Sequence, residues 1–249
     1  MVRILVLGKS GAAGVGLEDP SRAWPYLLRE TVEAETGEPV EVVIKRFYLI
    51  AADPTDYLRR VVDETQPDIV IARVAANDFA MVTVSHRVSS RWGARAARYV
   101  AQTERKLRRS WTPGKPGALD ALAQRIAHKV IGAEPLLTRA QVVASAEAMF
   151  RFFGQREELT GIMVGCPYFS PWVSSLNPGL DRIVDEFNDE MRAAAKARHL
   201  TWVEPTVRLE EDRLRDGMHE TESGHRRMVT DVLPAVLAAV RERAAAGVV

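Results

Sequence analysis

The sequence predicts an α/β fold in which a mostly parallel sheet is covered by helices on both faces. Short apolar runs alternate along the chain with longer segments of helical periodicity, the pattern of repeated β-α-β units. Of the 249 residues, 47% are hydrophobic and 27% are charged, which suits a packed core. In such sheets ligands bind beyond the carboxyl ends of the strands, so polar residues that directly follow a strand are the first site candidates.

The first half of the chain supplies three expected strands and two expected helices. The strand segments are short runs of branched and apolar residues. The helical segments carry a proline near their start, Pro25 and Pro54, where the missing N–H costs no hydrogen bond. The expected strands are 3–7, 40–47 and 68–74, and the expected helices are 22–36 and 54–65.

The second half repeats this alternation. Residues 161–166 predict a fourth strand, which Pro167 ends, and residues 200–203 predict a fifth. Residues 179–198 and 223–243 predict helices. In the first of these helices apolar residues recur at helical spacing: Leu180, Ile183, Val184, Phe187 and Met191.

More than 80 residues separate Asn77 from the fourth strand, and they contain no convincing strand pattern. Helical segments fit this stretch best. We therefore expect a single domain, residues 1–249, with a helical, lid-like insertion at residues 80–155. The expected helices of this stretch are 86–110, 117–131 and 138–153.

Charge is spread unevenly along the chain. The whole sequence carries a formal net charge of +1, whereas residues 85–130 contain 11 Lys or Arg and 2 Asp or Glu, a net +9, which leaves −8 for the remainder. The basic block lies in the expected insertion and calls for a local explanation. A nucleic-acid partner is not expected, because the overall balance is nearly neutral and no recognition module is present.

Cysteine usage and hydropathy bear on the compartment. Cys166 is the only cysteine, which excludes an internal disulfide and fits a reducing compartment. No apolar run approaches the length that spans a bilayer, and the N-terminal residues do not resemble a signal peptide. We expect a cytoplasmic protein with no membrane span.

The stretch "ILVLGKSGAAG", residues 4–14, allows two kinds of site. A phosphate-binding loop of the G-x-x-x-x-G-K-[ST] type needs a glycine where this chain has Arg3, and exposed N–H groups where it has Ile, Leu, Val and Leu. The pattern therefore disfavours a nucleotide site. The other interpretation is that Ser10 is a nucleophile on a tight turn, with small neighbours that leave its hydroxyl accessible; a simple packing turn explains the same residues.

A serine nucleophile needs a histidine base and an acid that orients the base. Asp216 and His219 lie three residues apart in the loop after the fifth strand, although a histidine in such a loop is often a surface residue. Asn77 follows the third strand and carries an amide that could donate to an oxyanion, or could serve as an ordinary helix cap. His225 is a rival base, but it lies within the last expected helix, where we expect a structural or solvent-facing role.

Two further residues offer competing chemistry. Lys9 invites a Ser-Lys pair, but adjacent residues of a turn usually point apart, so it fits better as the partner of an anionic substrate group or of a nearby acid. Cys166 would need its own histidine to act as a nucleophile, and none is close in sequence, so we expect a buried thiol.

Together these motifs resemble those of the SGNH/GDSL hydrolase family, over most of the chain except residues 80–155. The resemblance implies a flavodoxin-like, three-layer α/β/α sandwich with about five parallel strands, and it implies no cofactor and no metal. The matching residues are Gly8 and Ser10 in "GKSGAAG", Asn77 and Asp78 in "AAND", and Asp216 and His219 in "DGMH".

The resemblance also implies roles for these residues. Ser10 would be the nucleophile, His219 the base and Asp216 the orienting acid. The oxyanion hole would be formed by the backbone N–H of Ser10, the side chain of Asn77 and the backbone N–H of Ala52. Three positions depart from the family pattern: Lys9 stands for aspartate, and Ala52 and Ala75 stand for glycines.

We therefore expect a serine acyl hydrolase that acts on an ester or thioester through an acyl-serine intermediate. The alternatives are an acyltransferase of the same mechanism, with an anionic or carrier-bound acyl donor, and a non-catalytic binding protein of the same fold. The basic insertion favours a lid that receives an anionic substrate or an acidic acyl carrier, with Arg91 and Arg95 as candidate contacts; a solvated helix face explains the same arginines.

Overall fold

The computed structural model describes residues 1–49, 53–108, 118–207, 210–214 and 216–247. Within these ranges the five strands form one parallel sheet, as the sequence predicts, and the structure gives their order as β2-β1-β3-β4-β5. The strands are β1 (Val2–Gly8), β2 (Val40–Arg46), β3 (Ile69–Arg73), β4 (Thr160–Val164) and β5 (Thr201–Val203).

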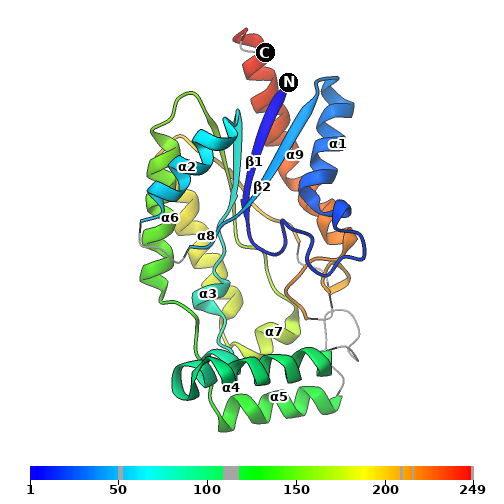
Figure 1. Cartoon of the computed structure of the whole chain (residues 1–249), viewed down its shortest axis with the longest axis vertical. Coiled ribbons are helices and arrows are strands. Elements are labelled where there is room, and N and C mark those ends of the chain that lie inside the picture. Colours follow the sequence, from blue (N-terminus) through cyan, green and yellow to red (C-terminus); the bar gives the residue numbers. More distant parts are fainter. Residues whose placement is uncertain (50–52, 109–117, 208–209, 215, 248–249) are drawn as a thin grey trace.

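Helices cover both faces of the sheet and complete the three-layer sandwich (Figure 1). Two helices pack on one face and three on the other, each layer with its own hydrophobic core. The first pair is α1 (Trp24–Thr36) and α9 (Glu222–Ala245), and the opposite layer is α2 (Thr55–Thr65), α6 (Arg139–Gly154) and α8 (Leu180–Lys196).

Strand β1 shows why the apolar runs of this sequence become central strands. Successive side chains of a strand point to opposite faces. Leu5 and Leu7 therefore pack in the core beneath α2, α6 and α8, while Ile4 and Val6 pack in the core beneath α1 and α9. Because both faces are covered, the strand is apolar throughout rather than alternating.

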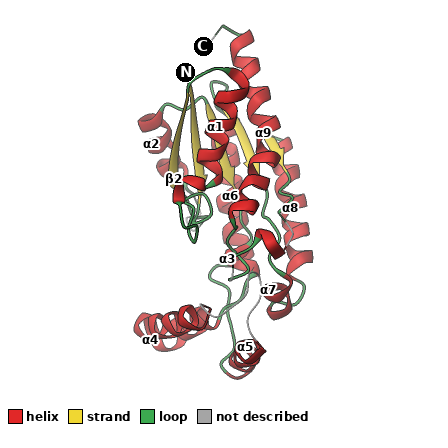
Figure 2. Ribbon diagram, turned by 90° about the vertical axis from the view of Figure 1, so that its right-hand side faces the viewer, coloured by secondary structure: helices red, strands yellow, loops and turns green. Residues whose placement is uncertain are grey.

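The insertion after β3 is narrower than residues 80–155. Helices α4 (Val84–Arg108) and α5 (Ala118–Val130) lie beyond the carboxyl ends of the strands, apart from the sandwich (Figure 2). Helix α6, by contrast, buries Phe150 and Phe153 against the sheet layer. The start and end of the α4–α5 hairpin meet at Thr83 and Glu134, whose backbones exchange two hydrogen bonds of 3.0 and 3.2 Å.

Short helical turns at the carboxyl ends of the strands were not expected from the sequence. Helix α7 begins after Ser170, whose hydroxyl accepts a hydrogen bond from the N–H of Val173, and Pro171 occupies its first turn. These turns are η1 (Pro20–Arg22), α3 (Asn77–Ala80), α7 (Pro171–Leu176) and η2 (Glu210–Asp212). Across the described ranges, no helix combines the length and apolar character needed to cross a bilayer.

Candidate active site

Ser10 lies on a run of tight turns directly after β1. The N–H of Ala12 donates to the carbonyl of Lys9 at 3.1 Å, and the N–H groups of Ala13 and Val15 donate to the carbonyl of Ser10 at 3.2 and 3.0 Å. The small side chains expected of this segment allow the chain to turn so closely. The turn places the Ser10 hydroxyl beyond the carboxyl edge of the sheet.

The structure brings Ser10, His219 and Asp216 into one hydrogen-bonded row. His219 Nε2 lies 2.7 Å from Ser10 Oγ, and His219 Nδ1 lies 2.6 Å from Asp216 Oδ2. The hydroxyl and the imidazole are 209 residues apart in the sequence. They meet because β1 and the loop before α9 end at the same edge of the parallel sheet.

The loop that carries the imidazole is held by its own aspartate. Asp216 Oδ1 accepts the backbone N–H groups of Met218 and His219 at 2.9 and 3.0 Å, while its other oxygen holds the imidazole. Gly217 has φ of 71°, the left-handed region that glycine enters without strain. A Cβ at this position would also lie 2.2 Å from Ser170 Oγ, so the loop needs a glycine here.

Burial and hydrogen bonding oppose one another in the acid–imidazole pair. Burial raises the pKa of the Asp216 carboxyl, but the hydrogen bonds and charge of His219 outweigh it and hold that pKa well below the usual range. Burial lowers the pKa of the His219 imidazole, but its hydrogen bond and attraction to Asp216 give a net increase. The site therefore holds an ionised acid beside an imidazole that takes up a proton readily.

A cavity of about 180 Å³ opens beside the Ser10 hydroxyl. Asn77, at the first turn of α3, lies in its wall together with His219. The cavity provides room for a small acyl or alcohol group within reach of the hydroxyl. Its other lining residues include Lys9, Gly11, Arg73, Ala75, Cys166, Phe169 and Met218.

Two candidate groups are buried, and neither belongs to the hydrogen-bonded row. His225 is 1% exposed, and its Nδ1 accepts the backbone N–H of Trp24 at 3.2 Å, so it joins α9 to the start of α1. Burial lowers the pKa of His225 to about 4, which keeps it neutral. Cys166 is also buried, and burial raises the pKa of its thiol, as expected of an inert cysteine.

Comparison with models of protein families identifies the enzyme family of this chain. The model of the GDSL-like lipase/acylhydrolase family matches residues 6–227, a stretch that includes the three hydrogen-bonded residues. The chain belongs to this family. It is therefore a serine ester hydrolase. A search of curated proteins finds no significant match.

Solved structures show the same GDSL-hydrolase fold at low sequence identity. TesA superposes with a TM-score of 0.56 at 16% identity, covering 95% of this chain and 99% of its own. A carbohydrate acetylesterase family member from Sinorhizobium meliloti gives 0.54 at 12% identity, covering 96% and 99%. A lipase/acylhydrolase from Enterococcus faecalis gives 0.52 at 17% identity, covering 96% of each chain. At these identities the likeness concerns the fold.

In this member of the GDSL family, the charge of the unusual Lys9 is paired with an acid of the same chain. The Lys9 ammonium forms an ion pair with the buried carboxylate of Asp78, the residue after Asn77, and does not contact the Ser10 hydroxyl in place of the imidazole. Asn77 Nδ2 in turn lies 3.2 Å from Asp78 Oδ1. Of the other two departures from the family pattern, Ala75 lines the small cavity, and Ala52 lies outside the described residues.

The two arginines expected to contact a substrate lie away from the hydroxyl. Arg91 and Arg95 are exposed on α4, and neither lines the small cavity beside Ser10. The Arg91 guanidinium lies 5.7 Å from the ring centroid of Trp92, itself 57% exposed. In the part of the chain that is described, no group of three His, Cys, Asp or Glu side chains is placed to hold a metal ion.

Sequence reasoning missed a buried ionic cluster behind the imidazole. Glu220 is 2% exposed and accepts from Arg73 at 2.6 Å and from Arg213 at 3.2 Å. Burial favours the neutral acid, but the two guanidinium groups lower the pKa of Glu220 to about 2. The available signals were an arginine near the end of a predicted strand and a glutamate that directly follows the candidate base.

The same ionic cluster leaves no room for a side chain at position 11, directly after the serine. A Cβ on Gly11 would lie 2.9 Å from Glu220 Oε2 and 3.0 Å from a terminal nitrogen of Arg73. The turn that carries Ser10 therefore rests directly on the ion pair. Glycine at position 11 allows this close approach between the N-terminal turn and the C-terminal loop.

Proposed function

We propose that the protein cleaves an ester or thioester through an acyl-serine intermediate, with Ser10 as nucleophile, His219 as general base and Asp216 as the acid that orients the imidazole. The observation that carries this proposal is the continuous hydrogen-bond row from Asp216 through His219 to Ser10. Asp216 fixes the tautomer in which Nδ1 carries the proton, which leaves the Nε2 lone pair facing the hydroxyl.

The reaction then proceeds in two halves. As Ser10 Oγ bonds to the carbonyl carbon, His219 Nε2 takes the hydroxyl proton, and the carbonyl oxygen becomes an oxyanion. Collapse of this intermediate breaks the bond to the leaving alcohol or thiol, which receives the proton from His219. Water, deprotonated by the same imidazole, attacks the acyl carbon. The bond from that carbon to Ser10 Oγ then breaks, Oγ takes the proton back from His219, and the carboxylic acid is released.

Asn77 is the proposed side-chain donor to the oxyanion. Its amide nitrogen carries two hydrogens, and the contact with Asp78 uses one of them. The other hydrogen can point into the cavity beside Ser10, which Asn77 lines. The backbone N–H groups of Ser10 and Ala52 are the other proposed donors. Each donor of this kind lowers the barrier by about 3 kcal/mol.

Substitution Ser10→Ala tests this function. We expect hydrolysis of p-nitrophenyl acetate to fall by several orders of magnitude, because the residual rate comes only from binding and the oxyanion donors. Ser21→Ala is the matched control, since Ser21 lies in η1 and its hydroxyl bonds Asp19 instead. Circular dichroism should show both variants folded. Near-normal turnover by Ser10→Ala would remove the serine from the mechanism.

A second candidate is transfer or hydrolysis of an acyl group delivered by an anionic carrier. It is favoured by exposed Arg91 and Arg95 on α4, beside exposed Trp92, in the most basic part of the chain. Arginine and tryptophan are enriched where proteins bind partners. Such a surface would raise the local concentration of an acidic acyl carrier or a phosphate-bearing thioester.

Charge reversal tests this candidate. The double variant Arg91→Glu/Arg95→Glu should raise KM for an acyl-CoA thioester several-fold and leave KM for p-nitrophenyl acetate unchanged. Arg59→Glu/Arg182→Glu makes the same change of charge on exposed sites of α2 and α8. Equal effects of the two double variants would show that only the overall charge matters, and the α4 surface would lose its role.

A further inference from the structure

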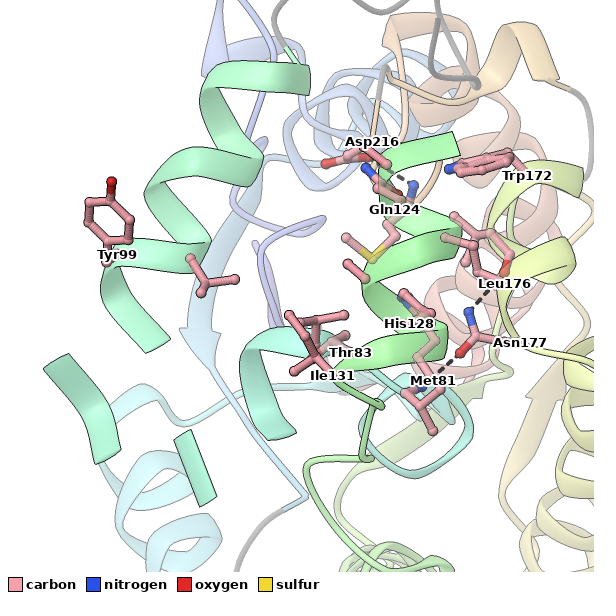
Figure 3. A pocket seen from close by; sticks show the side chains of 17 residues that line it. Met81, Thr83, Tyr99, Gln124, His128, Ile131, Trp172, Leu176, Asn177 and Asp216 are labelled. Carbon is pink, nitrogen blue, oxygen red and sulfur yellow. Dashed lines mark hydrogen bonds between the residues drawn. The ribbon is translucent and has the colours of Figure 1, made fainter. Parts of the chain in front are cut away.

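An apolar groove of about 340 Å³ separates the α4–α5 hairpin from α7 (Figure 3). Its volume lies in the range of small-ligand sites, which are mostly apolar with a few placed polar groups. Nothing in the triad chemistry requires this groove. The apolar lining residues include Met81, Val84, Val100, Ala127, Ile131 and Leu176.

The groove reaches the triad at one end. Asp216 and Met218 line it, and Met218 also lines the small cavity that contains the Ser10 hydroxyl. The side chain of Met218 is therefore the wall that the two spaces share. A substrate whose carbonyl lies at Ser10 can pass a chain along this unbranched, adaptable side chain into the groove.

Contacts between the hairpin and the sandwich define the shape of the groove. The Arg125 guanidinium of α5 lies 5.3 Å from the ring centroid of Trp172 in α7, a cation–π contact across the groove. At the base, Asn177 Oδ1 accepts the N–H of Val82 at 2.7 Å, and its Nδ2 donates to the carbonyl of Val173 at 2.8 Å. The walls thus come from the α4–α5 hairpin and α7. The Arg125 contact joins α5 to α7, and the Val82 contact joins the segment before α4 to the end of α7.

Apart from the ionised Asp216 at the end nearest Ser10, the polar side chains that line the groove are chiefly amides, hydroxyls and one imidazole. Burial lowers the pKa of His128, so its imidazole is uncharged at neutral pH. Gln124, one turn before it on α5, has its Nε2 buried and without a hydrogen-bond partner among the described residues. Figure 3 shows both side chains on α5, with Trp172 and Leu176 of α7 beside them. A ligand here would be uncharged and mainly hydrocarbon.

We propose that this groove binds the acyl chain of the substrate, and that the enzyme prefers medium-length, uncharged acyl groups over acetyl. The inference rests on the proposed function, because the chain is placed relative to a carbonyl at Ser10. Each methylene that leaves water for an apolar site strengthens binding about fourfold. A keto or hydroxyl oxygen part-way along the acyl chain would accept a hydrogen bond from Gln124 Nε2.

Filling the groove tests the assignment. Ala127→Trp places a large ring between α5 and α7, whereas Ala94→Trp adds the same ring on the exposed side of α4, outside the groove. For the wild type we expect kcat/KM to rise at least tenfold from p-nitrophenyl acetate to the octanoate. Ala127→Trp should lose that gain and keep acetate hydrolysis within about twofold, and Ala94→Trp should match the wild type.

A second series separates the acyl chain from the alcohol. Octyl acetate carries the same hydrocarbon on the other side of the carbonyl. If Ala127→Trp impairs octyl acetate and leaves the nitrophenyl octanoate unaffected, the groove holds the alcohol and the acyl assignment is overturned. Equal loss on acetate and octanoate would likewise overturn it, because the substitution would then act on the triad rather than on chain binding.

A binding measurement separates failure of the groove from failure of the proposed function. N-methyloctanamide carries the acyl chain on a linkage that resists hydrolysis, and calorimetry measures its binding without turnover. It should bind the wild type and Ser10→Ala alike and at least tenfold more weakly to Ala127→Trp. Such binding without ester hydrolysis would refute only the serine mechanism. Ester hydrolysis without such binding would refute only the groove.

Discussion

At the scale of single residues, Asp216 contributes twice to the site. One carboxylate oxygen binds the imidazole of His219, and the other binds two backbone N–H groups of the same loop. The aspartate therefore orients the proposed base and shapes the loop that carries it. This explains why a spacing of three residues, with a glycine between, joins Asp216 to His219.

The dependence of activity on pH follows from this pair. The proposed base acts only when neutral, so activity should rise with pH through the pKa of His219. Because the net effect of Asp216 raises that pKa above 6.5, the acidic limb of kcat/KM should have its midpoint above 6.5 in the wild type. A pH–rate profile with p-nitrophenyl acetate measures this midpoint.

Asp216→Asn should lower kcat by about 10⁴-fold, because the amide favours the wrong imidazole tautomer. It should also move the acidic limb to lower pH, since burial and the nearby Arg73 lower the pKa of His219 and only the weaker attraction of Glu220 then opposes them. A profile that keeps both its rate and its midpoint in this variant would contradict the role assigned to Asp216.

The positions of the polar site residues were predictable, and so was the row of Ser10, His219 and Asp216, but the acid that pairs with Lys9 was not. Ser10, Asn77 and His219 each follow a predicted strand, and parallel strands bring such positions to one edge. The pairing of Lys9 with Asp78 depends on side-chain directions at two strand ends, which periodicity does not specify. Glu220 gave no signal of burial, because a charged residue in a loop is usually exposed.

At the scale of elements, the buried cluster of Glu220, Arg73 and Arg213 joins β3 to the loop before α9. Arg213 also donates to the carbonyls of Met218 and Val207, at 2.9 and 3.2 Å. The cluster thus fastens the C-terminal loop to the centre of the sheet, with the turn of Ser10 lying on top. Burial of these three charges costs free energy, but the hydrogen bonds between them and to the backbone hold them in one arrangement.

Glu220→Gln should destabilise the protein at neutral pH by about 3–5 kcal/mol, because it leaves the buried guanidinium of Arg213 and the partly buried one of Arg73 without their counter-charge. The pKa of Glu220 is lowered from 4.5 to about 2 on folding. Its contribution is therefore fully present above pH 4.5 and is lost as pH falls toward 2. The difference in unfolding free energy between wild type and variant should shrink over that interval in urea titrations.

Glu222→Gln provides the control for this experiment. Its exposed carboxylate pairs with Arg22 and Arg226, so its removal should change stability little. If Glu220→Gln and Glu222→Gln behave alike at every pH, the buried cluster does not hold the loop.

The helices and strands were largely predictable because their periodicity and end signals are local. The packing of α6 against the sheet was not predictable. A run of buried aromatic residues indicates that a helix is covered, but it does not identify the element that covers it. Helix α7 did have a local signal, the Ser170-Pro171 pair at its start, although six residues are too few for periodicity to be seen. Single-turn elements such as α3 depend on the tertiary fold around them.

At the scale of the whole molecule, the fold gathers distant segments at the carboxyl edge of one sheet. The triad residues come from the two ends of the chain, Asn77 from the middle, and the α4–α5 hairpin lies beyond the same edge (Figure 1). The sandwich supplies a rigid support for the triad. The insertion, whose two ends meet at Thr83 and Glu134, forms one side of the groove proposed to bind the acyl chain.

The most direct test of the account is covalent labelling with a fluorophosphonate probe, followed by peptide mass spectrometry. We predict one adduct per wild-type chain, on Ser10, with labelling slowed by orders of magnitude in His219→Ala although that variant remains folded. A folded wild-type protein that stays unlabelled, or that carries the adduct on a residue other than Ser10, would contradict the claim that Ser10 and His219 form a working nucleophile and base.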